Sequence, residues 1–440
     1  MRTQAAIVPA RCGGASRPLI LAAISLWIVA TPAYSQTGGG KTRSCTANYD
    51  QPLASQAHLL GDWCDERTRL EHRGVRFDFQ YVSDNLWGSK GQQYSQFTSW
   101  NRFRATIDVD FGKLTGQDGL YFHATGLSQG GGNLGLDLGL LSGPSSLVSL
   151  NTTRLDSWWI EQRWLDDRIA VRAGQFAGQD FYGNAQFGES FINGPMGYGL
   201  GNLGTTLETA NPFATPAGEI RFVPIDNLYL KSMVMSGDPS PQTSNPTGLV
   251  PTFRGSPVFV SEIGFTPGRN ATLGTDDNAG TRKGYSGLYQ FGLAYNPGDF
   301  TAPLSPTPVS GNYLLYWKAS QALWRPDPKE ALGLDAVLAF DWSPTNVNRD
   351  FIQLTAGLRF NEPLPLGFHN SISLGYVRNN LSSDFLPAGM IAWRTEEGVE
   401  VNMLLNYGPF LFQPVVQYYT NVGGMAGHAV VAGLRTKIEF

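Results

Sequence analysis

Apolar and polar residues alternate along most of this chain, and the segment 97–111 shows the alternation most clearly. One face of this segment is apolar and carries Phe97, Phe103, Ala105, Ile107, Val109 and Phe111. The other face is polar and carries Arg102, Arg104, Thr106, Asp108 and Asp110. Successive side chains of a β-strand point to opposite faces, so this period of two predicts a strand between apolar and polar surroundings.

Similar segments recur from residue 75 to the end of the sequence. They are 75–87, 97–111, 118–126, 154–164, 168–176, 217–223, 228–236, 257–265, 285–296, 312–324, 333–342, 350–360, 371–378, 396–407, 411–420 and 428–440. An even number of tilted strands of about ten residues is typical of a bacterial outer-membrane barrel. The pattern therefore predicts an all-β fold, a transmembrane antiparallel β-barrel of about 16 strands.

The connections between these segments fall into a short and a long class. The short ones are 114–119, 224–227 and 407–410, and the long ones, rich in Gly, Pro, Asn and Ser, are 127–153, 177–214, 237–256 and 297–311. Short turns at one end and long loops at the other match the periplasmic and extracellular faces of such a barrel. The last segment ends on Phe440, and it must close the sheet because an open edge cannot be left in hydrocarbon.

Composition agrees with a barrel and excludes other classes. Gly accounts for 52 of the 440 residues, and charged residues for 15%, against about 25% in a typical soluble domain. The only long apolar run is at the N-terminus, which excludes a bundle of membrane-spanning helices, and a net charge of −4 leaves no basic surface for nucleic acid. Trp residues gather at predicted strand ends, as in the aromatic girdles of outer-membrane barrels: Trp87, Trp100, Trp164, Trp324, Trp342 and Trp393.

The N-terminus has the pattern of a secretory signal peptide. Basic residues precede the 12-residue apolar stretch Leu19–Ala30, which is shorter than the about 20 residues that a spanning helix needs. Ala33-Tyr34-Ser35 then fits a cleavage site, so we expect residues 1–35 to be removed on export. Export and the predicted barrel together predict that the mature chain lies in the outer membrane of a Gram-negative bacterium, surrounded by membrane lipids.

A short helix is expected between the signal peptide and the barrel. Residues 61–73 have a helical composition, with Asp62 as the N-cap and Gly74 as the stop. We therefore divide the chain into a signal peptide (1–35), a periplasmic N-terminal segment with the helix (36–73) and the barrel (74–440).

Two cysteines remain after export. Cys12 leaves with the signal peptide, whereas Cys45 and Cys64 stay in an oxidising compartment. We expect these two to form a disulfide, because an even pair in an exported chain usually pairs. Two free thiols are the alternative.

A barrel of about sixteen strands leaves an aqueous channel, so function depends on the loops that narrow it. The loop 177–214 carries several aromatic rings, and folding into the barrel would bury them and constrict the pore: Phe181, Tyr182, Phe187, Phe191 and Tyr198. The loop 127–153 contains the apolar sequence NLGLDLGLL, which we also expect to be packed and not exposed to solvent. The alternative is that both loops cap the barrel or contact a neighbouring subunit.

Five stretches resemble the OprB-type carbohydrate-selective porins, in the same order along the chain. They are LLGDWCDERTRLEHRGVRFDFQYVSDNLWG (59–88), LDSWWIEQRWLDDRIAVRAGQF (155–176), YLKSMVMSGDPS (229–240), GNYLLYWKASQALWR (311–325) and LFQPVVQYYTNVGG (411–424). The resemblance implies a sixteen-stranded outer-membrane porin, a homotrimer, that passes glucose and other mono- and oligosaccharides into the periplasm by facilitated diffusion. It also implies that Glu161 and Arg172 take part in the channel.

Alternation places several charged residues and one Trp on the lumen side as candidate pore-lining or sugar-contact residues. They are Arg102, Arg104, Asp108, Trp159, Glu161, Arg163, Arg172 and Lys231. Arginine and carboxylate groups can hydrogen-bond to sugar hydroxyls, and Trp159 could stack on the apolar face of a sugar ring. The alternative is that these charges form salt-bridge ladders that stiffen the wall and keep it wet.

Other functions find less support in the sequence. No pair of His residues has helical i, i+4 spacing and no G-x-S-x-G occurs, so we expect no enzyme, no cofactor and no metal. The lumen charges inferred from alternation are balanced, which favours neutral solutes over anions. A general or other-solute porin, and an adhesive or structural barrel that conducts little, remain as alternatives.

Overall fold

The computed structural model describes residues 52–91, 95–183, 190–198, 206–207, 212–268, 285–301, 307–328, 330–385 and 393–440. Its strands are β1 (Val75–Lys90), β2 (Gln96–Asp110), β3 (Leu120–Gly131), β4 (Thr152–Trp164), β5 (Ile169–Phe176), β6 (Thr215–Ile225), β7 (Leu228–Gly237), β8 (Ser256–Phe265), β9 (Gly287–Phe300), β10 (Val309–Trp324), β11 (Gly333–Trp342), β12 (Asp350–Asn361), β13 (Asn370–Leu381), β14 (Thr395–Tyr407), β15 (Phe410–Thr420) and β16 (His428–Glu439).

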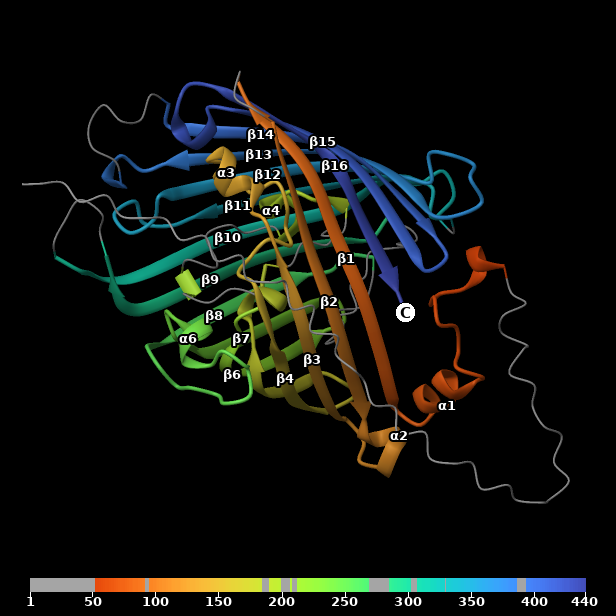
Figure 1. Ribbon diagram of the computed structural model, residues 1–440. Helices are drawn as coiled ribbons and strands as arrows, with labels where there is room; N and C mark the ends of the chain where they lie inside the picture. Colours follow the sequence, from red (N-terminus) through yellow and green to blue (C-terminus); the bar gives the residue numbers. More distant parts are fainter. Residues whose placement is uncertain are drawn as a thin grey trace, which may run out of the picture. The chain divides into compact units, whose positions relative to one another are not determined.

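These sixteen strands form one closed barrel in which each strand pairs with its neighbours in sequence. Every pairing is antiparallel, and β1 pairs with β16 to close the sheet, with Asp84 opposite Arg435. Figure 1 shows β1 and β16 running side by side, although they stand at opposite ends of the barrel sequence. The predicted antiparallel barrel of about 16 strands is therefore confirmed.

The barrel wall is apolar outside and largely polar inside, the reverse of a soluble protein. On β8, Phe259, Ile263 and Phe265 are exposed, whereas the alternate residues Val260 and Glu262 are buried. The same alternation on β2 leaves Phe97 and Phe103 exposed and buries Arg102. Exposed apolar rows are stable only against lipid, so the pattern is that of a membrane-spanning barrel.

The helices are short. They are α1 (Glu66–His72), α2 (Phe111–Thr115), α3 (Leu134–Leu138), α4 (Gly194–Tyr198) and α6 (Pro241–Ser244), with 3₁₀ turns η2 (Leu53–Ser55), η3 (Gly178–Asp180), η6 (Ser383–Phe385) and η7 (Val422–Gly424). Within the described part of the chain, none of these helices is long and apolar enough to cross a bilayer.

The helix expected at 61–73 is shorter than predicted, because it begins at Glu66. Trp63, Cys64 and Asp65 all have positive φ angles, and three successive left-handed residues cannot join a right-handed helix. The Asp62 carboxylate nevertheless caps the first turn, since it accepts a hydrogen bond from the Thr68 amide at 2.8 Å. Gly74, with φ +91°, follows the helix as predicted.

One predicted loop is partly strand. The segment 297–311 was expected to be a long loop, but β9 extends to Phe300 and β10 begins at Val309. The pairing shifts register between Ser310 and Asn312, and the Gly298 amide donates to Asn296 Oδ1 at 2.9 Å. Gly and Pro therefore mark an irregular strand end here, because a bulge tolerates them as a loop does.

Candidate functional site

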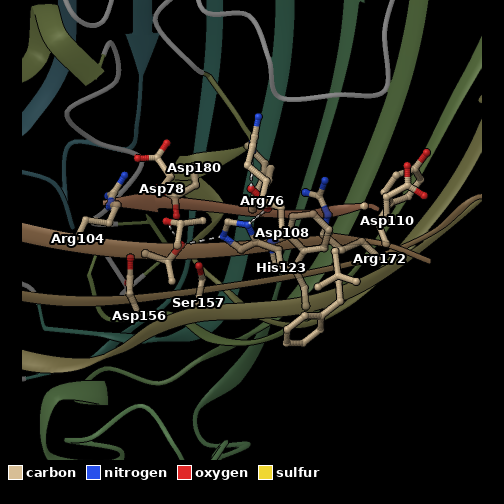
Figure 2. A pocket seen from close by; sticks show the side chains of 18 of the residues that line it. Arg76, Asp78, Arg104, Asp108, Asp110, His123, Asp156, Ser157, Arg172 and Asp180 are labelled. Atoms are coloured by element: carbon tan, nitrogen blue, oxygen red, sulfur yellow. Dashed lines mark hydrogen bonds and ion pairs between the residues drawn. The ribbon is translucent and has the colours of Figure 1, made fainter. Parts of the chain in front are cut away.

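A cavity of about 740 Å³ lies against the inner wall of β1 to β5. The η3 turn covers part of it through Gln179 and Asp180, and Glu71 of α1 lies at its border. Figure 2 shows Asp108 beside His123, with Asp156 and Ser157 on the neighbouring strand. The cavity is therefore built from one sector of the barrel and the first turn of the loop that follows β5.

The indole of Trp159 is held between groups from the two flanking strands. The imidazole of His123 on β3 stacks on it, with centroids 4.9 Å apart and an interplanar angle of 11°. From β5, the Arg172 guanidinium lies 4.3 Å from the ring centroid. Gly174, opposite Trp159, allows the close approach of the two strands, because a Cβ there would lie 2.6 Å from the Trp159 Cα and 2.8 Å from its Cβ. Phe181 of the loop that follows β5 also contacts this ring edge-on, with centroids 6.4 Å apart, so neighbouring groups hold the indole in place.

His123 belongs to a short polar chain along the cavity floor. Its Nδ1 lies 2.7 Å from Asp108 Oδ1, and its Nε2 lies 3.0 Å from the Thr125 hydroxyl. Asp108 also accepts a hydrogen bond from Arg76 at 2.9 Å. The chain combines donors and acceptors over a short distance, which suits contacts with hydroxyl groups.

Glu161 lies at the centre of a buried charge cluster instead of in the cavity. Its side chain is fully buried and forms ion pairs with Arg163 at 2.6 Å, with Arg172 at 2.7 Å and with Arg221. Glu219 joins the cluster through Arg221 at 3.1 Å. Two carboxylates and three guanidiniums therefore fix one another, and Arg163 and Arg172 extend from this cluster to the cavity lining.

A second buried carboxylate, Glu262 on β8, anchors the loop that follows β5. It accepts hydrogen bonds from the Gly183 amide at 2.9 Å and from the Tyr316 hydroxyl at 2.6 Å, and it pairs with Lys231 at 2.9 Å. Lys231 also donates to the Phe181 carbonyl, and Lys318 donates to the Gly183 carbonyl at 2.9 Å. The loop segment 177–183 is therefore held against the inner wall of β7 to β10.

The later part of the same loop is anchored on the opposite side of the lumen. Glu400 on β14 accepts the amides of Ile192 and Asn193 at 2.9 and 2.8 Å. Phe191 packs where β12 and β13 carry Gly357 and Gly375, whose absent Cβ atoms would lie 2.6 and 2.7 Å from the ring. The expected inward folding of loop 177–214 is therefore seen for its described residues, whereas Phe187 and the side chain of Tyr198 lie outside them.

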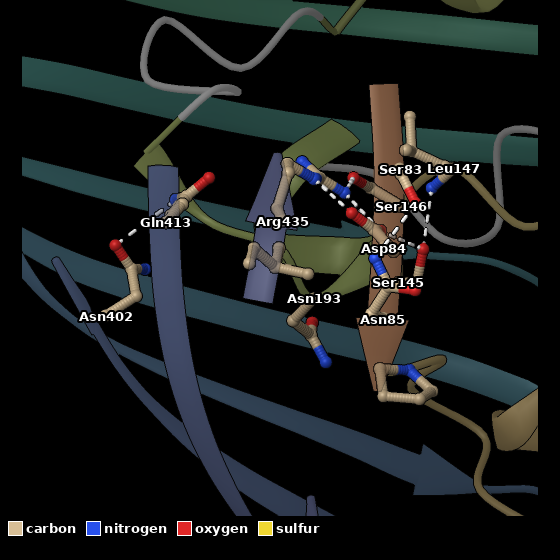
Figure 3. Close-up of polar contacts among 12 residues, drawn as sticks. Ser83, Asp84, Asn85, Ser145, Ser146, Leu147, Asn193, Asn402, Gln413 and Arg435 are labelled. Carbon is tan, nitrogen blue, oxygen red and sulfur yellow. Dashed lines mark hydrogen bonds and ion pairs between the residues drawn. The ribbon is translucent and has the colours of Figure 1, made fainter. Parts of the chain in front are cut away.

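The loop between β3 and β4 also folds into the barrel. Leu134, Leu138 and Leu140 of the NLGLDLGLL stretch are buried in a cluster with Leu86 and Val431 of the inner wall. Its polar residues contact the β1–β16 seam from inside (Figure 3). Ser145 donates to Asp84 at 2.5 Å, and Arg435 pairs with Asp84 at 2.6 Å and donates to Ser146 at 3.0 Å.

The two loops are hydrogen-bonded to each other inside the barrel. The Ser146 amide donates to the Ile192 carbonyl at 2.7 Å, and the Gly194 amide donates to the Gly143 carbonyl at 2.8 Å. Together they narrow the lumen that sixteen strands would otherwise leave open.

The N-terminal segment packs on the end of the barrel where the short turns lie. Buried Arg67 of α1 donates to the Phe440 main-chain oxygen at 2.7 Å and to the Phe77 carbonyl at 3.3 Å, across the β1–β16 seam. His58, which precedes it, is partly buried. Burial lowers the pKa of His58 below its ordinary value of 6.5, and the nearby Arg67 guanidinium lowers it further.

The predicted site residues separate into two groups. Arg104, Asp108, Trp159, Arg163 and Arg172 line the cavity. Glu161 and Lys231 are lumen-facing but bind other parts of the protein, and Arg102 is buried on the lumen side outside the cavity lining. Cys64 is disulfide-bonded, and Cys45, its predicted partner, lies outside the described residues, as does the predicted signal peptide 1–35. That pairing and that cleavage remain predictions.

Sequence reasoning missed several groups that shape the site. Glu396 and Glu400 have the alternation of lumen residues, but nothing local indicates that they accept loop amides, those of Leu141 and Ser142 and those of Ile192 and Asn193. Nor does anything local indicate that Arg221 pairs with Glu161 and Glu219.

Asp156 was missed because it is the extra residue of a bulge on its own strand, where Thr125 pairs with Ser157 and Gly126 pairs with Leu155. Its Oδ1 is buried at the cavity and has no hydrogen-bond partner among the described residues.

Residues 96–440 match the family model of the carbohydrate-selective porins, the OprB family. The chain belongs to this family. It is 23% identical over 427 residues to Porin B of Pseudomonas aeruginosa, covering 87% of this chain and 91% of that protein. Its fold is similar to the high-pH structure of Pseudomonas putida OprB, with a TM-score of 0.77, 18% identity and coverage of 88% of this chain and 99% of that one. The low-pH structure of the same protein gives a TM-score of 0.56.

Membership and fold together place this porin in the outer membrane, and they make it a channel and not an enzyme. The cavity and the two anchored loops lie within the lumen of this channel. In the described residues, no group of three or more His, Cys, Asp or Glu side chains could hold a metal ion.

Proposed function

We propose that this porin passes neutral carbohydrates, glucose and other mono- and oligosaccharides, through the narrowed lumen into the periplasm. The solute contacts the 740 Å³ cavity on its way, beside Trp159 and along the chain of Asp108, His123 and Thr125. The short-turn end, where α1 packs, faces the periplasm.

The observation that carries the proposal is the charge balance of the cavity lining. Its acidic residues are Glu71, Asp78, Asp108, Asp110, Asp156 and Asp180, and its basic ones are Arg76, Arg104, Lys113, Arg163 and Arg172. Six acidic against five basic groups give nearly no net charge, whereas a pore for anions would carry an excess of Arg and Lys. Alternating donors and acceptors instead suit a solute rich in hydroxyl groups.

Asp156 gives the lining an unfilled acceptor. A buried carboxylate oxygen without a hydrogen-bond donor is unfavourable, and a sugar hydroxyl reaching it would supply the donor. The gain in binding free energy must be small, because a channel site has to release the solute that it binds. We therefore expect millimolar affinity for glucose.

Conductance of single channels in a planar bilayer, with glucose added in steps, tests the proposal. The ion current should fall as glucose rises, and Asp156→Asn should shift the half-blocking concentration upward. Asp226→Asn is the matched control, because Asp226 lies in the short turn between β6 and β7, paired with Arg168. A current that does not respond to glucose would instead make this a general porin.

A further inference from the structure

The sheet is incomplete beyond β5, toward the end of the barrel where the long loops lie. β4 has 13 residues, but β5 pairs with it only between Trp158 and Trp164. β5 has eight residues, whereas a strand that spans a membrane needs about 9–11. It ends at Phe176, and β6 begins directly opposite, at Thr215. In the described part of the chain, the edge of β4 over residues 152–157 therefore has no strand beside it on the β5 side.

This free edge of β4 lies at the depth of the membrane. Trp164, an exposed ring, marks the short-turn end of the strand. From Trp164 to Leu155 the strand extends for about 30 Å. At a tilt of about 40° this is a rise of about 23 Å, within an apolar band about 25 Å tall. A strand edge left open in hydrocarbon is unfavourable, so another segment must cover it.

The loop 238–255, between β7 and β8, covers the edge. The Leu155 amide of β4 donates to the Thr247 carbonyl at 2.9 Å. Gly248 approaches the same residue so closely that a Cβ there would lie 1.7 Å from the Leu155 carbonyl oxygen. Gln175, near the end of β5, donates to the Gly248 carbonyl at 3.0 Å. The loop therefore occupies the place of the missing strand and forms part of the wall.

The second half of the loop lies against the outer face of β7. The Ser236 hydroxyl donates to the Arg254 carbonyl at 2.6 Å, and the Arg254 amide donates to Ser236 Oγ at 3.0 Å. Ser236 points to the same side as Val234, because Met235 between them is buried in a cluster with the inward loop. Val234 is exposed on the outer wall. Phe253, next to Arg254, is thus held on the outer side of the barrel.

Three apolar side chains of this loop are exposed. Leu249 is 68% exposed, Val250 65% and Phe253 84%. On the strands beside the loop, Val234 of β7 and Phe259 of β8 lie opposite each other and are exposed as well. The apolar surface of the two strands therefore continues onto the loop.

The backbone of the loop is largely satisfied without water. The Gly248 amide donates to the Asn245 carbonyl at 3.2 Å, and the Val250 amide donates to Asn245 Oδ1 at 3.2 Å. Pro251 has no amide hydrogen. Irregular backbone at membrane depth is tolerated where the protein itself satisfies its polar groups, whereas a loop in water has no such need.

We propose that the loop 238–255 is a lipid-facing part of the wall, and that Leu249, Val250 and Phe253 contact the acyl chains of the outer leaflet. Acyl chains are the occupant because the three side chains continue the lipid-facing rows of β7 and β8 at a depth within the apolar band. Long loops of such barrels ordinarily extend into the medium, and this one returns to the membrane. The proposal concerns the outer face alone and is independent of the solute that passes through the lumen.

Spin labels on the mature porin in phosphatidylcholine vesicles test where the loop lies. Labels at Val250→Cys and Phe253→Cys should collide more often with oxygen, which concentrates among acyl chains, than with a water-soluble nickel complex. The label at Val234→Cys, on the lipid-facing wall, should behave in the same way. Gln242→Cys, at an exposed polar position of the same loop, is the matched control and should favour the nickel complex. Cys64 is disulfide-bonded and does not take a label.

The two other outcomes of this experiment overturn the proposal. Labels at Val250→Cys and Phe253→Cys that favour the nickel complex would place the loop in water. Labels shielded from both reagents would show that a protein surface, and not lipid, covers the three side chains.

Unfolding by urea from the same vesicles gives a second test without a label. Phe253→Ser should lower the urea concentration at the midpoint, because the ring leaves water for lipid when the barrel folds. Leu136→Ser is the matched control, since Leu136 is 77% exposed on the loop between β3 and β4 and should not change the midpoint. An unchanged midpoint in Phe253→Ser, or an equal fall in both variants, would refute the lipid contact. Glucose block should be unchanged in Phe253→Ser, so this proposal and the sugar pathway fail or stand separately.

Discussion

Arg172 lies over the ring of Trp159, with its guanidinium carbon 4.3 Å from the ring centroid, while its Nη2 pairs with Glu161 at 2.7 Å. The same guanidinium is 4.0 Å from the ring of Phe181 in the inward loop. One cation therefore connects the barrel wall, the loop and the cavity. A guanidinium held by a carboxylate and two rings has little freedom, and it offers a solute a preorganised donor.

Arg172→Gln should weaken the glucose block of the ion current. We expect the half-blocking concentration to rise roughly tenfold, because a hydrogen bond to a charged group contributes about 1.5 kcal/mol. The barrel should still fold, since Glu161 keeps Arg163 and Arg221. Arg168→Gln, at the edge of the barrel, is the control. An unchanged block in Arg172→Gln would show that this guanidinium does not meet the solute.

Glu161→Gln should destabilise the barrel and make the pore more selective for anions. The substitution leaves the buried Arg172 and Arg221 with only Glu219, and breaking such a buried pair costs about 3–5 kcal/mol. The reversal potential in a salt gradient should move toward that of chloride, and the unfolding temperature should fall. Asp226→Asn, an exposed carboxylate of the same charge, should change neither quantity. A reversal potential shifted toward cations would contradict the proposed charge arrangement.

Glu262→Gln should loosen the inward loop and raise single-channel conductance. Every group around this carboxylate is a donor: the Gly183 amide, the Tyr316 and Tyr229 hydroxyls, Gln290 and Lys231. A Gln amide nitrogen would face one of these donors and lose its bond. Glu397→Gln is the control variant, because Glu397 lies on the outer face of β14. Equal conductance in both variants would mean that Glu262 does not hold the constriction.

Acidification should weaken the packing of the N-terminal segment on the barrel. Burial and Arg67 lower the pKa of His58, although Asp78 and Glu439 partly oppose this. When the segment is released, His58 returns to its ordinary pKa of about 6.5 and is therefore protonated at a higher pH than in the packed state. The packing is thus fully stable above this pH and weakens as the pH falls below it. Limited proteolysis around residues 52–72 should be faster at pH 5 than at pH 7.5. His58→Gln should remove most of this difference, and a difference that stays the same would assign the pH effect to another group.

The strands of this porin could be predicted from the sequence because the residues of each strand alternate according to whether they face lipid or the lumen. A period of two distinguishes lipid from lumen within a single segment, so the lumen side of Arg104, Asp108 and Trp159 followed from local pattern alone. Deviations arose where the backbone is irregular: at Trp63 to Asp65, where left-handed residues delay the helix, and at Gly298, where a strand continues through loop-like residues.

The roles of the lumen residues depended on contacts between distant parts of the chain. Glu161 and Lys231 face the lumen as predicted, but Glu161 is enclosed by arginines from β4, β5 and β6, and Lys231 holds a loop carbonyl 50 residues away in sequence. Alternation tells which side of a wall a residue faces, not which loop returns to cover it. The sequence by itself determined the barrel and its two faces, because those depend on neighbouring residues. Only the closed tertiary structure decided which charges meet the solute and which fasten the loops.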